Sequence, residues 1–141
     1  MVLSEHDRKR VQQMLGGMVD PIRLVFFTQS LSCDSCLPAR QILDALVPLG
    51  NKLTLEERNP ILDTDAASQF AVDRVPAIAV VAGERDTGIR FYGAPAGYEF
   101  GALIDAVVAA STGQSGLSDA SRTQLASVAS PVRIKVFVTP T

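Results

Sequence analysis

Apolar and polar residues alternate with two different periods along this chain, and together the two periods predict an α/β domain. Apolar residues at the helical spacing of three and four positions predict helices over residues 4–15, 36–47, 63–70 and 97–110. Nearly continuous or alternating apolar runs predict strands over residues 22–28, 52–58, 77–82 and 88–93. A hairpin around residues 83–86 joins the last two strands. The predicted order is β-α-β-α-β-β-α, preceded by one helix.

The end of the chain repeats its beginning. Segment 117–119 (LSD) echoes segment 3–5 (LSE), and segment 130–137 (SPVRIKVF) echoes segment 20–27 (DPIRLVFF). We therefore predict a first unit over residues 1–112, with a linker by composition over residues 111–116. Residues 113–141 are then a linker, a helix and the first strand of an incomplete second unit. The alternative is an ordinary C-terminal helix and strand added to one domain.

The strand predicted over residues 132–138 needs hydrogen-bonding partners, because it is as apolar as the strand that it echoes. It either adds to an edge of the first unit's sheet or pairs with the same strand of a second chain, which makes a homodimer possible.

Composition excludes several classes of function. The 141 residues are 47% hydrophobic and 20% charged, and 13 basic against 15 acidic residues give a net charge of −2. This balance supplies no basic field for nucleic acid or an anionic membrane. No apolar run approaches the ~18 residues of a membrane span. The first ten residues are charged and lack the apolar core of an export signal, so we expect a cytoplasmic protein.

The two cysteines, Cys33 and Cys36, form one C-x-x-C motif between a predicted strand and a helix. At a helix N-terminus, free backbone N–H groups and the helix dipole stabilise a thiolate, and a second thiol one turn on can attack a mixed disulfide. A zinc site would need two more ligands, and His6 is the only histidine. We therefore expect a redox-active pair without a metal or bound cofactor; an inert or purely structural pair is the alternative.

Three features together resemble a known family. They are the C-x-x-C at a strand-to-helix junction, Val75-Pro76 about forty residues later before a hairpin, and segment 88–100 (GIRFYGAPAGYEF). The chain resembles the two-unit protein disulfide oxidoreductases, the glutaredoxin-like proteins of archaea and some bacteria. It is also similar to the N-terminal region of the alkyl hydroperoxide reductase flavoprotein subunit.

The resemblance implies a thioredoxin-like α/β fold, with a central mixed four-stranded sheet flanked by helices and here an extra C-terminal helix and strand. It implies dithiol–disulfide exchange on protein substrates, with electrons from a thioredoxin-reductase-like flavoprotein. By position, Cys33 is the nucleophile and Cys36 the resolving thiol. Pro76 is a cis-proline, and the backbone of Val75 pairs with an extended substrate segment.

The sequence also departs from the thioredoxin pattern. Asp34 and Ser35 separate the cysteines and are expected beside the bound substrate. The Asp34 carboxylate opposes a Cys33 thiolate and favours a reducing couple, unless it is only a solvated helix cap. Phe27 stands where thioredoxins carry a buried acid. Glu57 on the neighbouring strand is the best substitute, although a surface glutamate at the strand edge is equally compatible with the pattern.

The sequence thus favours a protein disulfide oxidoreductase. Two alternatives remain: a domain that relays electrons to a peroxidase, and a non-enzymatic module that binds extended peptides beside Pro76.

Overall fold

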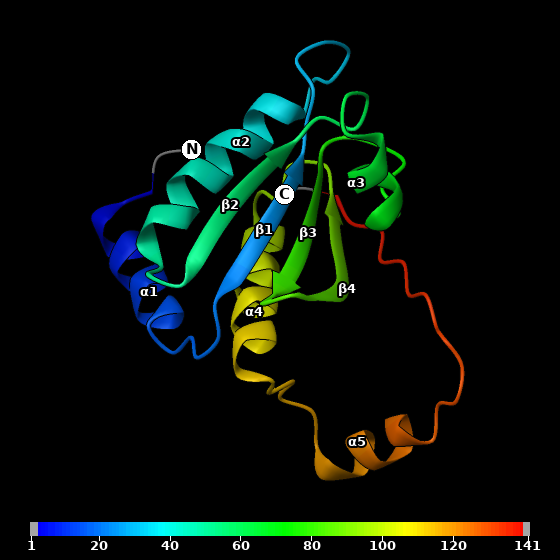
Figure 1. Cartoon of the computed structure of the whole chain (residues 1–141). Coiled ribbons are helices and arrows are strands. Elements are labelled where there is room, and N and C mark those ends of the chain that lie inside the picture. The colour runs from blue at the N-terminus through cyan, green and yellow to red at the C-terminus, as the bar shows by residue number, and fades with distance from the viewer. Residues whose placement is uncertain (1–2, 140–141) are drawn as a thin grey trace.

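The computed structural model describes residues 3–139. It contains one mixed sheet with helices on both faces (Figure 1). Its helical elements are α1 (Glu5–Leu15), α2 (Cys36–Leu46), the 3₁₀ turn η1 (Val47–Leu49), α3 (Thr64–Gln69), α4 (Tyr98–Thr112) and α5 (Asp119–Ala126). Its strands are β1 (Ile22–Phe27), β2 (Leu53–Arg58), β3 (Ala77–Ala82) and β4 (Arg85–Tyr92).

The four strands lie in the order β2-β1-β3-β4. The β1 and β2 strands are parallel, whereas the β1/β3 and β3/β4 pairs are antiparallel. The mixed four-stranded sheet predicted from the sequence is therefore confirmed. In its register Phe27 pairs with Arg58 on one side and with Ala77 on the other, which brings the ends of three strands to one edge of the sheet.

Both faces of β1 are covered, which explains its nearly continuous apolar run. Leu24 and Phe26 pack in the core under α1, α2 and α4, whereas Val25 and Phe27 face the smaller core under α3 (Figure 1). All four side chains are fully buried. Burial of an apolar side chain of this size contributes about 1.5–3 kcal/mol, so β1 is the best-anchored element of the sheet.

The last strand begins three residues earlier than its prediction over residues 88–93. Gly88, read as a strand boundary, lies inside β4 with φ +80° at a break in the register between Ala79 and Val81 of β3. The Thr87 hydroxyl donates to the Val80 carbonyl at 2.6 Å and bridges the irregularity. The glycine thus marks a bulge within the strand rather than its start.

The linker predicted over residues 111–116 begins too early. Helix α4 continues through Thr112 and ends at Gly113, whose φ is +71°, and Ser111 in its last turn is fully buried. The Ser111 hydroxyl donates to the Asp20 carbonyl at 2.6 Å and accepts from the Val19 amide at 2.9 Å. Polar composition predicts a linker here, but the hydroxyl instead ties α4 to the segment that leads into β1.

The helix predicted in the tail is present, whereas the strand predicted over residues 132–138 is not. Helix α5 buries no side chain, and residues 128–139 are exposed without regular secondary structure. Within the described chain, residues 129–139 make no backbone hydrogen bond. A strand needs a neighbour for its N–H and C=O groups, and neither edge of the four-stranded sheet supplies one to this segment.

We predict that Ser111→Ala lowers the free energy of unfolding by about 2 kcal/mol, because it removes both hydrogen bonds of the fully buried Ser111 hydroxyl, the one to the Asp20 carbonyl and the one from the Val19 amide. Chemical denaturation measures the change. Ser127→Ala is the matched control, since its hydroxyl is exposed and contacts only Gln124 of its own turn; it should cost less than about 0.5 kcal/mol. Equal losses in the two variants would contradict the role of Ser111.

Deletion of residues 130–141 should leave the free energy of unfolding within about 0.5 kcal/mol of the full chain, because no side chain over residues 130–139 is buried. Denaturation and a disulfide-exchange assay of the truncated chain test this. Unfolding of the truncated chain, or loss of its disulfide exchange, would show that the tail is an integral part of the first unit.

Candidate functional site

The cysteines lie where the chain leaves the central strand and enters α2. After Phe27 a loop over residues 28–35 extends beyond the sheet (Figure 1). The Gln29 side-chain amide donates to the Leu31 carbonyl at 2.8 Å, and Ser32 adopts a left-handed conformation with φ +55°. This turn, directly before Cys33, brings the chain back toward the start of the helix.

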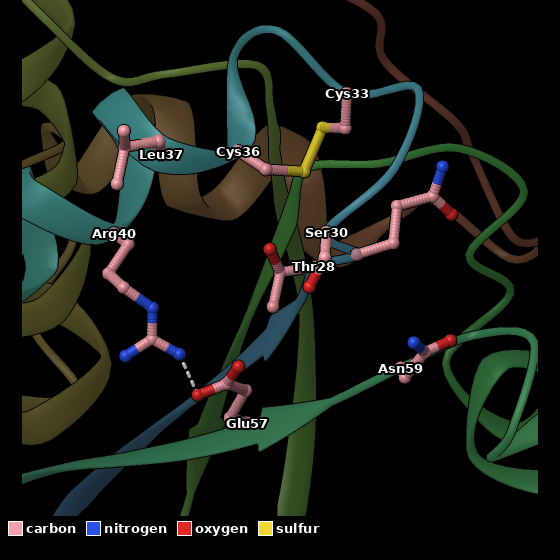
Figure 2. Close-up of a pocket in the computed structure, with 9 residues that line it drawn as sticks. Thr28, Ser30, Cys33, Cys36, Leu37, Arg40, Glu57 and Asn59 are labelled. Atoms are coloured by element: carbon pink, nitrogen blue, oxygen red, sulfur yellow. Dashed lines mark hydrogen bonds and ion pairs between the residues drawn. A yellow bond between two sulfur atoms is a disulfide. The ribbon is translucent and has the colours of Figure 1, made fainter.

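Cys33 and Cys36 are joined by a disulfide, with their Cα atoms 5.4 Å apart (Figure 2). Cys36 is the first residue of α2 and is 4% exposed, whereas Cys33 in the loop is half-buried. An incoming thiolate therefore reaches the Cys33 sulfur more easily than the Cys36 sulfur.

Pro38 does not interrupt α2, which runs without a break from Cys36 to Leu46. The proline occupies the third helical position, where a backbone N–H would have no partner within the helix. The first turn thus accommodates the proline ring, and Cys36 keeps its place at the helix N-terminus.

A shallow pocket of about 320 Å³ opens beside the disulfide on the β2 side. Its lining comes from the loop, from the first turns of α2 and from the end of β2: Thr28, Gln29, Ser30, Cys33, Cys36, Leu37, Arg40, Glu57 and Asn59 (Figure 2). The structure thus brings Glu57 and both cysteines to one cavity. Glu57 is half-exposed and forms an ion pair there with Arg40.

Arg40 is the charged residue of the pocket lining that reasoning from the sequence missed. A helix places residues i and i+4 on the same face, so the spacing from Cys36 to Arg40 was the available signal. Its guanidinium Nη2 donates to Glu57 Oε2 and links α2 to β2 in the pocket beside the disulfide (Figure 2).

The neighbouring carboxylate, Glu56, faces the opposite side of the sheet and takes no part in this pocket. A hydrogen bond from Arg23 lowers the pKa of Glu56, opposed by partial burial, and Arg58 adds a second hydrogen bond. The alternation along β2 therefore separates a structural carboxylate from one that faces the disulfide.

The peptide bond between Val75 and Pro76 is cis, as the resemblance implied. Pro76 precedes Ala77, the partner of Phe27, so it lies at the same end of the sheet as the cysteine loop. Neither Val75 nor Pro76 lines the pocket, and Asp34 and Ser35 are exposed outside it. Of the predicted site residues, Glu57 therefore lies on the β2 side of β1, and Val75 and Pro76 lie on the β3 side.

Neither a metal centre nor a membrane segment emerges from the described chain. Over residues 3–139, no three histidine, cysteine, aspartate or glutamate side chains gather closely enough to hold a metal ion. Within the same residues, no helix is both long and apolar enough to cross a bilayer.

Several solved structures of other proteins resemble this chain in fold. No protein-family model and no curated protein matches the sequence. A protein disulfide oxidoreductase from Aeropyrum pernix K1 is 31% identical, with a TM-score of 0.76 over 90% of this chain and 56% of its own. The N-terminal domain of alkylhydroperoxide reductase AhpF from Enterococcus faecalis is 21% identical, with a TM-score of 0.79 over 88% of this chain and 60% of its own.

A smaller match extends the comparison. A single-substitution variant of a thioredoxin from Halobacterium salinarum is 16% identical, with a TM-score of 0.55 over 65% of this chain and 76% of its own. The chain has a thioredoxin-like fold, and the resemblance noted in the sequence is confirmed. It spans only 56–60% of the length of the first two structures. The fold and the Cys33–Cys36 disulfide together support thiol–disulfide oxidoreductase chemistry in general.

We predict that iodoacetamide alkylates Cys33 at least about ten times faster than Cys36 in the reduced protein at neutral pH, because Cys33 is half-buried in the loop whereas Cys36 is 4% exposed. Peptide mapping by mass spectrometry measures both rates. In denaturant the two rates should become equal, which is the internal control. Equal rates in the folded protein would contradict the assigned roles.

Proposed function

We propose that this chain reduces or exchanges disulfides in proteins, with Cys33 as the nucleophile and Cys36 as the resolving thiol. The observation that carries the proposal is that the two cysteines differ in exposure and in their position relative to α2. Cys33 is half-buried at the outer end of the loop, whereas Cys36 is 4% exposed at the first position of α2.

The reaction conserves atoms and electrons in two displacements. The Cys33 thiolate attacks a substrate disulfide, forms a mixed disulfide and releases one substrate thiolate. Cys36 loses its proton and attacks the Cys33 sulfur, which breaks the bond to the substrate and leaves the Cys33–Cys36 disulfide. The substrate gains two electrons, and an external dithiol donor returns them to the pair. We propose a thioredoxin-reductase-like flavoprotein as that donor, in the cytoplasm.

The substrate segment is proposed to lie on the β3 side of the disulfide, beside Val75, Pro76, Asp34 and Ser35. Within residues 3–139, the N–H and C=O groups of Val75 make no backbone hydrogen bond. Val75 is half-buried, while Asp34 and Ser35 are exposed. An extended peptide can therefore pair with the Val75 backbone while its disulfide faces Cys33.

We further propose that residues 113–141 are the opening of a second unit. What supports this is a repeated helix start: Ser4 accepts a hydrogen bond from the Asp7 amide, and Ser118 accepts one from the Ser121 amide. Both cap residues have nearly the same backbone angles, φ −63° and ψ 158° against φ −64° and ψ 158°. The exposed apolar segment 132–138 would then pair within such a unit or with a second copy of the chain.

The electron-relay alternative is supported by the structural likeness to the N-terminal domain of AhpF. It predicts that the reduced chain passes electrons to a thiol peroxidase faster than to a protein disulfide. The peptide-binding alternative predicts peptide binding that persists when both cysteines are replaced by serine.

The deciding experiment is insulin reduction by dithiothreitol. The wild-type chain should accelerate the reaction, and Cys33→Ser should remove the acceleration entirely. Cys36→Ser should retain the first displacement and accumulate a mixed disulfide detectable by mass spectrometry. A wild-type rate no higher than that of dithiothreitol alone would refute protein disulfide reduction.

A further inference from the structure

We propose that Arg90 of β4 is a positioning residue for the substrate segment: it holds Phe70 and thereby fixes the turn that presents the Val75 backbone to an extended peptide. The inference rests on the proposed function, because it assigns a support to the β3-side edge at which that proposal places the substrate.

The segment that leads to Val75 is fixed at its two ends and has little support between them. Within the described residues, positions 73–75 make no backbone hydrogen bond. On the downstream side, the Pro76 carbonyl accepts a hydrogen bond from the Gly93 amide at 3.0 Å. The position of the Val75 edge therefore depends on how firmly the upstream end, where α3 ends at Phe70, is held.

Arg90 holds that upstream end through both edges of its guanidinium. Its Nε donates to the Phe70 carbonyl at 3.0 Å, and its Cζ lies 5.5 Å from the centroid of the Phe70 ring. Both of its Nη atoms donate to the Asp86 carboxylate, Nη1 at 2.8 Å. The Arg90 side chain is only 16% exposed. Because the guanidinium is planar, binding at both edges gives it one orientation, and Phe70 is fixed with it.

The peptide group that Arg90 binds begins an unfavourable turn. Ala71 follows Phe70 directly, and its φ of +52° lies in the left-handed region, which residues with a side chain rarely adopt. At this point the chain leaves α3 and turns toward Val75. The hydrogen bond from Arg90 to the Phe70 carbonyl therefore stabilises the turn at its first peptide group.

Phe70 also connects the turn to the cysteine loop. Its ring packs edge-on against the ring of Phe27, with the two centroids 6.0 Å apart, and both side chains are buried. Phe27 is the last residue of β1, and the cysteine loop begins directly after it. By holding Phe70, Arg90 thus sets the Val75 edge relative to the disulfide, as a peptide that binds at one and reacts at the other requires.

The other side-chain contact between this turn and β4 is more open to solvent. Arg74 lies over the Tyr92 ring, with its Cζ 5.5 Å from the centroid. Its side chain is 66% exposed, and its ion-pair partner Asp73 belongs to the same turn. This contact gains little from desolvation, so Arg90 is the better-buried anchor of the two.

The same sheet offers a matched control. Arg23 of β1 also forms an arginine–carboxylate pair, with Glu56 of β2. It lies one residue after the start of β1, whereas Phe27 and the cysteine loop lie at the other end of that strand. Arg23→Met therefore removes the same kind of interaction without touching Phe70.

The experiment compares two peptides in single turnovers with the reduced protein. Each peptide carries one cysteine as a mixed disulfide with thionitrobenzoate, and one of them has methyl groups on the backbone nitrogens beside the cysteine, which prevents pairing with Val75. Attack by the Cys33 thiolate on the peptide sulfur breaks the disulfide and releases thionitrobenzoate as a coloured thiolate. The wild-type chain should prefer the unmethylated peptide by about tenfold, because only that peptide forms hydrogen bonds with the Val75 backbone.

Arg90→Met should remove most of this preference by slowing the unmethylated peptide alone. The loss should appear in the peptide concentration that gives half the limiting rate, and the limiting rate itself should stay unchanged, because the thiol chemistry is intact. Arg23→Met should keep the full preference.

Phe70→Leu tests the same link from the other side, including the case in which Arg90→Met does not fold. It keeps the carbonyl but removes the ring, so it should cause a smaller selective loss. If Arg90 acts through Phe70, the double variant should lose less than the product of the two single losses.

Slowing of both peptides to the same extent would overturn the role of Arg90, because a general loosening of the fold affects every reaction of Cys33. A preference that persists in Arg90→Met, single losses that multiply in the double variant, or a wild-type chain without any preference would overturn it as well. Absence of thionitrobenzoate release from both peptides with the wild-type chain would instead refute the proposed function.

Discussion

The burial of β1 between two layers of helices is the constraint on which the rest of this molecule depends. Its alternate side chains fill two separate cores, and its backbone is paired on both sides, in parallel with β2 and antiparallel with β3. Because Phe27 pairs with Arg58 of β2 and with Ala77 of β3, the end of β1 has a fixed position relative to both strands. The cysteine loop, the Glu57 carboxylate and the cis-proline are placed by that one register.

This placement gives the disulfide two chemically different sides. On the β2 side it borders a pocket that contains one cation and one anion, Arg40 and Glu57. On the β3 side Pro76 lies at the same end of the sheet, next to Val75, whose N–H and C=O groups make no backbone hydrogen bond within residues 3–139.

The parts of the structure with local sequence signals could be predicted. The strand at residues 22–27, the capped helix after Ser4 and the C-x-x-C at the start of α2 each follow from spacing within a few residues. Ser111 and Arg40 could not be predicted with the same certainty, because their partners lie far away in sequence at Val19, Asp20 and Glu57. The strand expected at residues 132–138 failed for a related reason: its pattern is right, but a strand exists only beside another strand.

The hydrogen bond between Ser111 and Asp20 also fixes the end of the sheet at which the tail leaves the first unit, here called a pole. Asp20 lies just before β1 begins, whereas the cysteine loop follows its far end, so α4 terminates at the pole opposite the disulfide (Figure 1). A six-residue strand spans about 20 Å, the distance that separates the two poles. The chain beyond Gly113 therefore starts one strand length away from the disulfide, and after α5 it turns back toward that end of the sheet (Figure 1). There a hydrogen bond from Arg74 and, to a smaller extent, the charge of Lys135 lower the pKa of Asp73, two residues before Val75.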